Sequence, residues 1–268
     1  MGHRYIWRWL LLGLGVGGCM IGWLKNPAPV TAAELARIQR RGHLRVAVKD
    51  NLKPLGFRTE TGQLQGFEID LAQRLAQDLW GEAEAALLVP VSNAERLPAV
   101  VSGTVDLAIA NLSDSDNRRR VVQFSQPYYV SGTGILTTHP GIRRPRDLTH
   151  RSVAVLQGSR AIAIVQSALP GVHLVGVNSY QGAQQALDRQ EVDAFVGDAV
   201  VLQGWAQPGS QYRYLPQGLA THRLAIALPK GTQFASVRQW VDQRLQSLQQ
   251  EGWLEERQQY WGLNNVQR

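Results

Sequence analysis

The sequence contains a single cysteine, Cys19, among its 268 residues. One cysteine cannot form an internal disulfide, and a cysteine-rich zinc site is excluded as well. The six histidines lack the spacing of metal ligands and are interpreted as scattered surface residues. They are His3, His43, His139, His150, His173 and His222. The sequence therefore predicts no metal site and no cofactor.

Dense clusters of positive charge are also scarce, although the formal net charge is +7. A basic balance can favour nucleic acid, an anionic membrane surface or an acidic ligand. The basic runs at residues 118–120 and 143–146 are short, and they are not interleaved with aromatic residues. We therefore expect no nucleic-acid partner. With 44% apolar and 18% charged residues, the composition is that of a globular protein with one large domain or two small ones.

Only one apolar stretch approaches the length of a membrane span, and it lies near the N-terminus. Residues 9–24 carry no charge and follow the basic residues Arg4 and Arg8. At about sixteen residues the stretch is slightly short for a spanning helix, and its layout is that of an export signal. Val16-Gly17-Gly18-Cys19 resembles a bacterial lipobox, in which Cys19 would be lipidated. An uncleaved membrane anchor and plain secretion are the alternatives.

All three alternatives place the folded part of the chain in the periplasm or another extracytoplasmic space. Residues 1–25 are accordingly predicted to be the signal peptide with its lipobox, or a membrane anchor. Residues 26–42 are predicted to form a linker and a short helix that ends at Gly42. We expect the protein to be tethered to the membrane as a lipoprotein.

From Gly42 onward, strand-like segments alternate with segments of helical periodicity, and the alternation occurs twice. Each half contains a similar motif, "VDLAIAN" at residues 105–111 and "VDAFVGD" at residues 192–198. Such alternation predicts an α/β fold with mostly parallel sheets. Open sheets of this kind bind ligands beyond the carboxyl ends of their strands. Two facing halves would therefore share one site between them.

Polar side chains follow the strands of both halves. Ser113-x-x-Asp116 has the pattern that begins a helix, and a helix N-terminus suits an anion. Arg118 follows, and its guanidinium group can bind a carboxylate through two hydrogen bonds. In the second half, Ser159 is expected to cap the next helix. Asp198 ends the last strand and either binds an ammonium group or caps the following helix. Together these side chains complement an α-amino acid.

Six stretches of the chain resemble the polar-amino-acid family of extracellular solute-binding proteins, which serve ABC importers. They are "GHLRVAVKD", "GQLQGFEIDLAQRLA", "RLPAVVSGTVDLAIANLSDSDNRRRVVQFSQPYYVSG", "DLTHRSVAVLQGS", "ALDRQEVDAFVGD" and "EGWLEERQQYWG". The resemblance covers about residues 42–262. It implies a periplasmic binding protein-like type II fold, in which two lobes are joined by two hinge strands.

The resemblance also implies the division of the chain and its partners. Residues 43–135 with 226–263 would form lobe 1, and residues 136–225 would form lobe 2. The hinge strands would cross near residues 134–138 and 224–228. An amino acid ligand would be held between the lobes and delivered to the permease subunits of an ABC importer.

By position, the resemblance assigns roles to five residues. Arg118 would clamp the α-carboxylate of the ligand, and Asp198 would bind its ammonium group. Ser113 and the backbone at Asn111 would contact the ligand from lobe 1. The hydroxyl of Ser159 would reach the carboxylate from lobe 2.

Three residues depart from the family pattern. Leu52 stands where an aromatic residue usually stacks over the ligand. Lys49 replaces the aspartate that is common in binders of basic amino acids. Arg160 occupies a position that faces the ligand side chain in several relatives and is commonly threonine. Lys49 and Arg160 would repel lysine or arginine, so the pattern favours an acidic or polar ligand.

Two other functions stay open at this point. The same bilobed unit serves as a sensory module in amino-acid receptors, where a partner chain would be needed for signalling. A few relatives are dehydratases of cyclohexadienyl acids such as arogenate, and these need a further acid in the site. The sequence offers no nucleophile–base pair, metal set or evident further acid. Binding rather than catalysis is therefore predicted.

Overall fold

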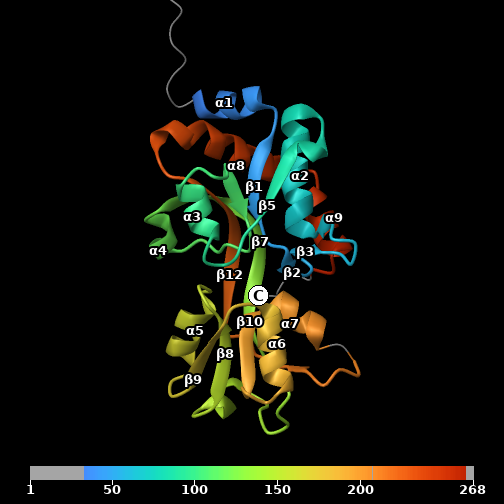
Figure 1. The fold of residues 1–268 in the computed structure, drawn as a ribbon, viewed down its shortest axis with the longest axis vertical. Helices are drawn as coiled ribbons and strands as arrows, with labels where there is room; N and C mark the ends of the chain where they lie inside the picture. Colours follow the sequence, from blue (N-terminus) through green and yellow to red (C-terminus); the bar gives the residue numbers. More distant parts are fainter. Residues whose placement is uncertain (1–32, 207, 264–268) are drawn as a thin grey trace, which may run out of the picture.

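The computed structural model of the protein describes residues 33–206 and 208–263. The export segment predicted at residues 1–25, with Cys19, lies outside the described residues. Figure 1 shows two lobes arranged along the long axis of the molecule and joined by a pair of long strands. No helix within the described ranges has the length and apolarity needed to span a membrane. The predicted α/β fold of two lobes is confirmed.

The first lobe contains a parallel sheet with strands in the order β5-β1-β6. The central strand β1 (Leu44–Val48) is almost entirely buried, because helices cover both faces of the sheet. Helix α2 (Phe67–Trp80) packs on one face, and α3 (Arg96–Val101) packs on the other. The other elements of this lobe are α1 (Ala33–Arg41), β2 (Asn51–Leu52), β3 (Gly56–Arg58), β4 (Leu64–Gln65), η2 (Ala83–Ala85), β5 (Ala86–Pro90), β6 (Leu107–Ile109), α4 (Asp116–Arg119), η4 (Thr232–Phe234), α8 (Ala235–Gln250) and α9 (Trp253–Tyr260).

The second lobe repeats the arrangement with parallel strands in the order β10-β8-β9. One face of this sheet has its own apolar cluster, which includes Val165 of α5. Residues on the other face, including Tyr180 and Phe195, join the large cluster that extends into lobe 1. The elements of this lobe are η3 (Pro145–Leu148), β8 (Ser152–Leu156), α5 (Ala161–Ala168), β9 (His173–Val177), α6 (Tyr180–Asp188), β10 (Ala194–Asp198), α7 (Ala199–Trp205) and β11 (Arg213–Tyr214).

Two antiparallel strands, β7 (Val122–Thr137) and β12 (Ala220–Pro229), run through both lobes. In lobe 1, β12 pairs with β6, and in lobe 2, β7 pairs with β10. Between these two sets, residues 130–132 pair with residues 221–223. The crossing therefore falls slightly upstream of the segments 134–138 and 224–228. The predicted lobe boundaries stay predictions, since both hinge strands continue through them.

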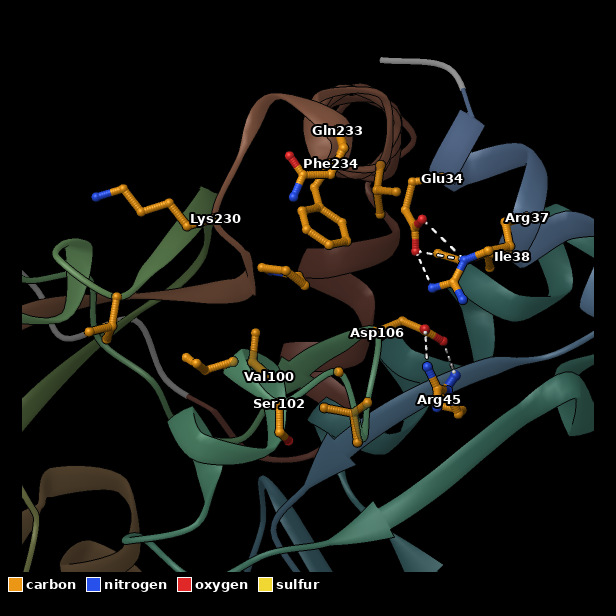
Figure 2. Close-up of a pocket in the computed structure, with 16 residues that line it drawn as sticks. Glu34, Arg37, Ile38, Arg45, Val100, Ser102, Asp106, Lys230, Gln233 and Phe234 are labelled. Carbon is orange, nitrogen blue, oxygen red and sulfur yellow. Dashed lines mark hydrogen bonds and ion pairs between the residues drawn. The ribbon is translucent and has the colours of Figure 1, made fainter. Parts of the chain in front are cut away.

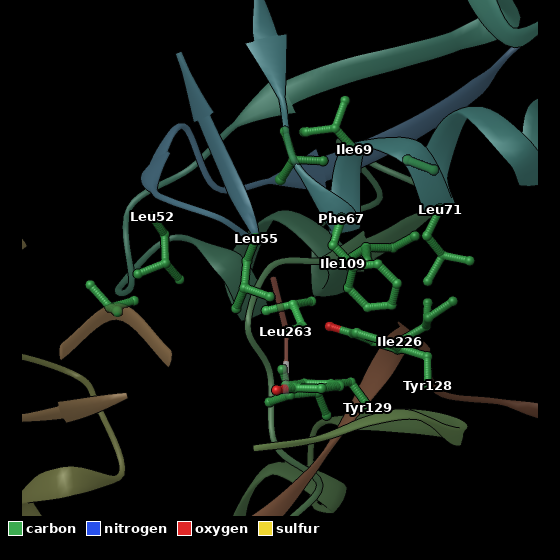
Figure 3. Packing of buried hydrophobic residues seen from close by; sticks show 14 of the residues in the cluster. Leu52, Leu55, Phe67, Ile69, Leu71, Ile109, Tyr128, Tyr129, Ile226 and Leu263 are labelled. Atoms are coloured by element: carbon green, nitrogen blue, oxygen red, sulfur yellow. The ribbon is translucent and has the colours of Figure 1, made fainter. Parts of the chain in front are cut away.

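Aromatic packing connects α2 with the hinge strand β7. The ring of Phe67, the first residue of α2, lies 6.0 Å from the rings of both Tyr128 and Tyr129, measured between centroids. Figure 3 shows these rings together with Leu52 of β2 and Leu55 of the turn between β2 and β3. The start of α2 and the lobe 1 end of the hinge are thus parts of one core.

The repeated Val-Asp motif makes the same backbone contacts in each lobe. The amide of Asp106 donates to the carbonyl oxygen of Arg45, at 2.9 Å, and its carboxylate accepts from the amide of Arg45, at 2.8 Å. Asp193 exchanges the equivalent pair of bonds with Ser152, at 2.8 and 2.9 Å. Each aspartate therefore fastens the start of one parallel strand to its neighbour, and the repetition reflects packing.

The two aspartates differ in burial, and this difference predicts different stabilities. The Asp106 side chain is 3% exposed and pairs with Arg41 and Arg45, whereas that of Asp193 is 24% exposed and pairs with the half-exposed Arg151. We expect Asp106→Ala to lower the free energy of unfolding by about 3 kcal/mol, because it leaves the donors of Arg41 and Arg45 without their acceptor. Asp193→Ala should cost about 1 kcal/mol. Urea unfolding measures both values, and equal losses would contradict the assignment.

Candidate functional site

Asp198 is the last residue of β10, and its carboxylate lies where the second lobe meets the first. Its Oδ2 atom accepts hydrogen bonds from Nδ2 of Asn111 and from the hydroxyl of Tyr180, each at 2.7 Å. Nε2 of His222, on hinge strand β12, lies 3.3 Å from Oδ1. Asn111 follows β6 in lobe 1, so its bond to Asp198 joins the two lobes directly.

The surroundings of Asp198 favour its ionised form. Burial opposes ionisation, since the side chain is only 15% exposed. The neighbouring His222 and the hydrogen bonds from Tyr180 and Asn111 outweigh burial and lower the pKa of the carboxyl below its ordinary value. The carboxylate is therefore charged at neutral pH. Asp198 occupies the N-cap position of α7, as the alternative prediction has it, but its side chain makes no capping hydrogen bond there.

Arg118 lies on the four-residue helix α4 and is held by Ser113. Its Nη1 atom donates to the backbone oxygen and to Oγ of Ser113, at 2.8 Å each. Burial lowers the pKa of the Arg118 guanidinium, and the charge of Asp198 opposes this shift. Ser113 does not begin the helix as predicted, because Ser115 stands at the N-cap position. Ser113 instead orients Arg118.

The loop after β8 brings Ser159 and Arg160 to the junction of the lobes. The preceding Gly158 has a φ of 67°, and a Cβ built on it would lie 3.8 Å from Asn93 of lobe 1. Oγ of Ser159 and Nε of Arg160 are buried, and neither has a hydrogen-bond partner among the described residues. Arg160, not Ser159, occupies the N-cap position of α5, and no side-chain cap bond forms there. The prediction that Ser159 caps this helix is wrong.

A buried arginine that the sequence analysis missed fixes the position of Asn111. Asn111 has a left-handed backbone with a φ of 53°, which asparagine tolerates better than most residues. Arg96 of α3 is 3% exposed, and its Nη1 atom donates to the backbone oxygens of Ala110 and Asn111, at 2.8 Å each. Burial lowers the pKa of the Arg96 guanidinium to about 10, and Arg118 adds to this effect. Arg96 therefore positions the asparagine that reaches Asp198.

Glu68 of α2 supports Asn111 from the other side and was also missed. Its Oε1 atom accepts from the backbone amide of Asn111 at 2.8 Å and from the hydroxyl of Tyr128 at 2.5 Å. The side chain has no exposed surface, and burial raises the pKa of its carboxyl to about 7. Glu68 and Arg96 stand at helix starts, where charged residues usually face solvent. Only their positions close to strand ends could have signalled another role.

The interpretation of His222 as a surface residue is wrong. The residue is 7% exposed, because it lies on hinge strand β12 between the lobes. It faces Ser131 across the hinge pair, and its Nδ1 atom and the hydroxyl of Ser131 have no partner among the described residues. No group of three or more His, Cys, Asp or Glu side chains within residues 33–206 and 208–263 could hold a metal ion.

Lys49 and Leu52 are engaged inside lobe 1. Nζ of Lys49, a residue only 4% exposed, donates to the backbone oxygen of Val91 at 2.8 Å. Burial lowers the pKa of this ammonium group to about 8. Leu52 is 1% exposed and packs in the large core cluster with Leu55 and Phe67. Their predicted contacts with a ligand stay predictions, and the structure gives both side chains partners within their own lobe.

A separate cavity of about 390 Å³ lies on the side of lobe 1 that faces α1 and η4. Figure 2 shows that, among the residues that line it, Glu34 pairs with Arg37 and Arg45 pairs with Asp106. The remaining charged residue, Lys230, donates to the backbone oxygens of Arg119 and Arg120 at the C-terminal end of α4. Every charged side chain that lines the cavity therefore has a partner within the protein. We place the candidate site at Asp198 instead.

The chain is similar to proteins of one family along most of its length. The family model of bacterial extracellular solute-binding proteins, family 3, matches residues 44–264. A glutamine-binding protein of Geobacillus stearothermophilus is 29% identical over 201 residues, which cover 74% of this chain and 77% of that protein. A cyclohexadienyl dehydratase of Pseudomonas aeruginosa is 28% identical over 246 residues, which cover 85% and 86%.

The solved structures lead to the same fold. The crystal structure of a solute receptor for L-cysteine from Neisseria gonorrhoeae superimposes with a TM-score of 0.79 at 26% identity, covering 84% of this chain and 92% of that one. The chain therefore has the fold of a type II periplasmic amino-acid-binding protein.

The raised pKa of Glu68 predicts how stability changes with pH. The folded protein keeps this proton up to about pH 7, whereas the ordinary pKa in an unfolded chain is 4.5. The folded form therefore binds more protons within this window, and stability falls as pH rises through it, by roughly 3 kcal/mol. Glu68→Gln keeps the acceptor for Asn111 and Tyr128 but removes the titration.

We expect the decline in unfolding free energy between pH 5 and pH 8 to be smaller in Glu68→Gln than in the parent protein. Chemical denaturation at several pH values measures it. Glu60→Gln, at an exposed position, serves as the control and should leave the decline unchanged. A Glu68→Gln variant with the parent's pH dependence would contradict the assignment.

Proposed function

The chain belongs to the bacterial extracellular solute-binding proteins of family 3, and we propose that it binds an amino acid between its lobes for delivery to an ABC importer. The ligand's α-carboxylate would be bound by Arg118, and its ammonium group by Asp198. Ser113, Ser159 and the backbone at Asn111 would complete the contacts. Delivery would require permease subunits as partners, which recognise the closed form with its ligand.

The observation that carries this proposal is the direct contact between the lobes at Asp198. A charged carboxylate of lobe 2 and a guanidinium of lobe 1 stand at one junction, and each retains hydrogen-bonding capacity. An α-amino acid offers the complementary pair of charges within one small molecule. A ligand that binds both lobes stabilises their closed arrangement, and this is how hinge proteins of two lobes respond to ligands.

A dehydratase activity receives less support from the site. Such an enzyme would need an acid that reaches the ligand in addition to Asp198. Glu68 is the nearest candidate, and its pKa suits proton transfer. It is however fully buried behind Asn111, with Oε1 bonded to the Asn111 amide and to Tyr128. We therefore favour binding without chemistry, and incubation with arogenate or prephenate should yield no aromatic product.

We propose further that Cys19 carries a lipid that tethers the protein to the outer face of the cytoplasmic membrane. The support is the sequence before Cys19 and the basic, then apolar, layout of the segment. A single tether would keep the binding lobes near the importer. Labelling of cells with a fatty-acid analogue should mark the parent protein, and Cys19→Ala should lose the label. Label that persists in Cys19→Ala would contradict the tether.

The function is tested by a thermal-shift screen of the full-length chain against the twenty amino acids. Bound ligand is removed beforehand by unfolding and refolding the protein. A ligand at one hundred times its dissociation constant should stabilise the folded form by about 2.7 kcal/mol. Absence of a shift with every amino acid would contradict the proposed function.

Two variants then test the site itself by calorimetry with the ligand that the screen finds. Arg118→Ala should weaken binding by about 3 kcal/mol, because it leaves a desolvated carboxylate without its partner. Asp198→Asn should abolish measurable binding while the fold persists. Arg120→Ala and Asp116→Asn change exposed residues of the same segment and serve as matched controls. Unchanged affinity in either site variant would remove that residue from the site.

A further inference from the structure

Arg160 carries a charge for which the described chain provides no ion-pair partner. Every aspartate and glutamate of the sequence lies within the described residues, and none of them forms an ion pair with Arg160. Its Nε atom is buried and has no hydrogen-bond acceptor among those residues. The residue as a whole is half-buried, but a buried guanidinium nitrogen without an acceptor is unusual, because its desolvation is costly unless another group compensates it. Nε of Arg160 is therefore free to donate to an acceptor from outside the described chain.

The junction of the lobes has an excess of positive charge. Arg118 from lobe 1 and Arg160 from lobe 2 both interact with the single carboxylate of Asp198. Burial lowers the pKa of the Arg160 guanidinium to about 10, Asp198 opposes this, and the charge of Arg118 adds to it. Asp198 already accepts bonds from Asn111 and Tyr180. Two cations from opposite lobes thus share one anion.

The two charged groups of a zwitterionic amino acid do not neutralise the excess positive charge at the junction. Under the proposed function, its carboxylate pairs with Arg118 and its ammonium group pairs with Asp198. These two pairs neutralise one another and leave the charge of Arg160 uncompensated. An apolar side chain on the ligand would bury Arg160 further without an acceptor, an amide would offer it an oxygen without a charge, and a basic side chain would repel it.

We propose that Arg160 binds an acidic group on the ligand's side chain, and that the site is therefore specific for acidic amino acids. This inference rests on the proposed function and names its substrate class. A guanidinium group binds a carboxylate through two parallel hydrogen bonds, which suits a side-chain carboxylate better than an amide. The unpartnered hydroxyl of Ser159, adjacent in the chain, can donate a further bond to the same group.

Lys49 does not share this role. Its ammonium group donates to the backbone oxygen of Val91 inside lobe 1, so its hydrogen bond is directed away from the Asp198 junction. The sequence pattern favoured an acidic or polar ligand on the basis of both Lys49 and Arg160. Arg160 is therefore the residue expected to recognise the charge of the ligand's side chain. The inference can be tested at this single position.

The test compares carboxylates with their neutral amides of the same shape. Calorimetry measures the affinity of the refolded full-length chain for L-glutamate, L-glutamine, L-aspartate and L-asparagine. We expect one of the acids to bind about 10- to 100-fold more tightly than its amide, the range for a charge-assisted pair of hydrogen bonds. Arg160→Gln should remove this preference by lowering the affinity for the acid. The affinity for the amide should change less than about threefold.

Two further variants separate charge recognition from structure. Arg160→Lys keeps the charge and should retain part of the preference for the acid. Arg146→Gln removes the same charge from an exposed position of lobe 2 and should leave both affinities unchanged. Thermal unfolding without ligand confirms that each variant is folded.

The possible results distinguish this inference from the function on which it rests. Tight binding of neutral amino acids with no preference for the acids would overturn the inference and leave the proposed function standing. An equal loss of acid and amide binding in Arg160→Gln would also overturn it, because the residue would then serve the structure of the loop. Failure of every amino acid to bind would overturn both.

Discussion

The carboxylate of Asp198 lies at the junction of two lobes, where little water reaches it and the protein supplies its hydrogen-bond donors. The donors are Asn111 after β6 and Tyr180 at the start of α6, and His222 on hinge strand β12 lies 3.3 Å from the other carboxylate oxygen. A buried charge loses more free energy when one donor is missing than a neutral group would. The positions of both lobes and of the hinge are therefore linked through this one carboxylate.

Two buried residues, Arg96 and Glu68, hold Asn111 in position. Arg96 donates to the backbone oxygens of Ala110 and Asn111, and Glu68 accepts from the backbone amide of Asn111. The left-handed backbone of Asn111 directs its amide toward lobe 2 and is maintained by these two buried side chains. Their pKa values, about 10 and about 7, show how much burial works against the ionisation of each group. Specific binding of a small ligand needs such rigid support, because mobile side chains do not hold the ligand in one orientation.

The parts of this structure that depend on short-range pattern could be predicted from the sequence. The alternation of strands and helices indicated both lobes, and the Val-Asp repeat marked equivalent strands, which Asp106 and Asp193 fasten in the same way. The burial of His222 could not be predicted, because a hinge strand joins segments that are distant in sequence. Lys49 and Arg160 looked alike as charges at strand ends. Only the fold separates them, by giving Lys49 the acceptor on Val91 and leaving Nε of Arg160 without one.

The orientation of the ligand is the central claim, and a crystal structure of the complex tests it most directly. The protein would be crystallised with the amino acid that stabilises it most, at a resolution that distinguishes the ligand's carboxylate from its ammonium group. We predict density between the lobes, with the α-carboxylate within hydrogen-bonding distance of Arg118 and the ammonium group within hydrogen-bonding distance of Asp198. Density in the cavity beside α1, or a ligand bound in the reverse orientation, would contradict this account.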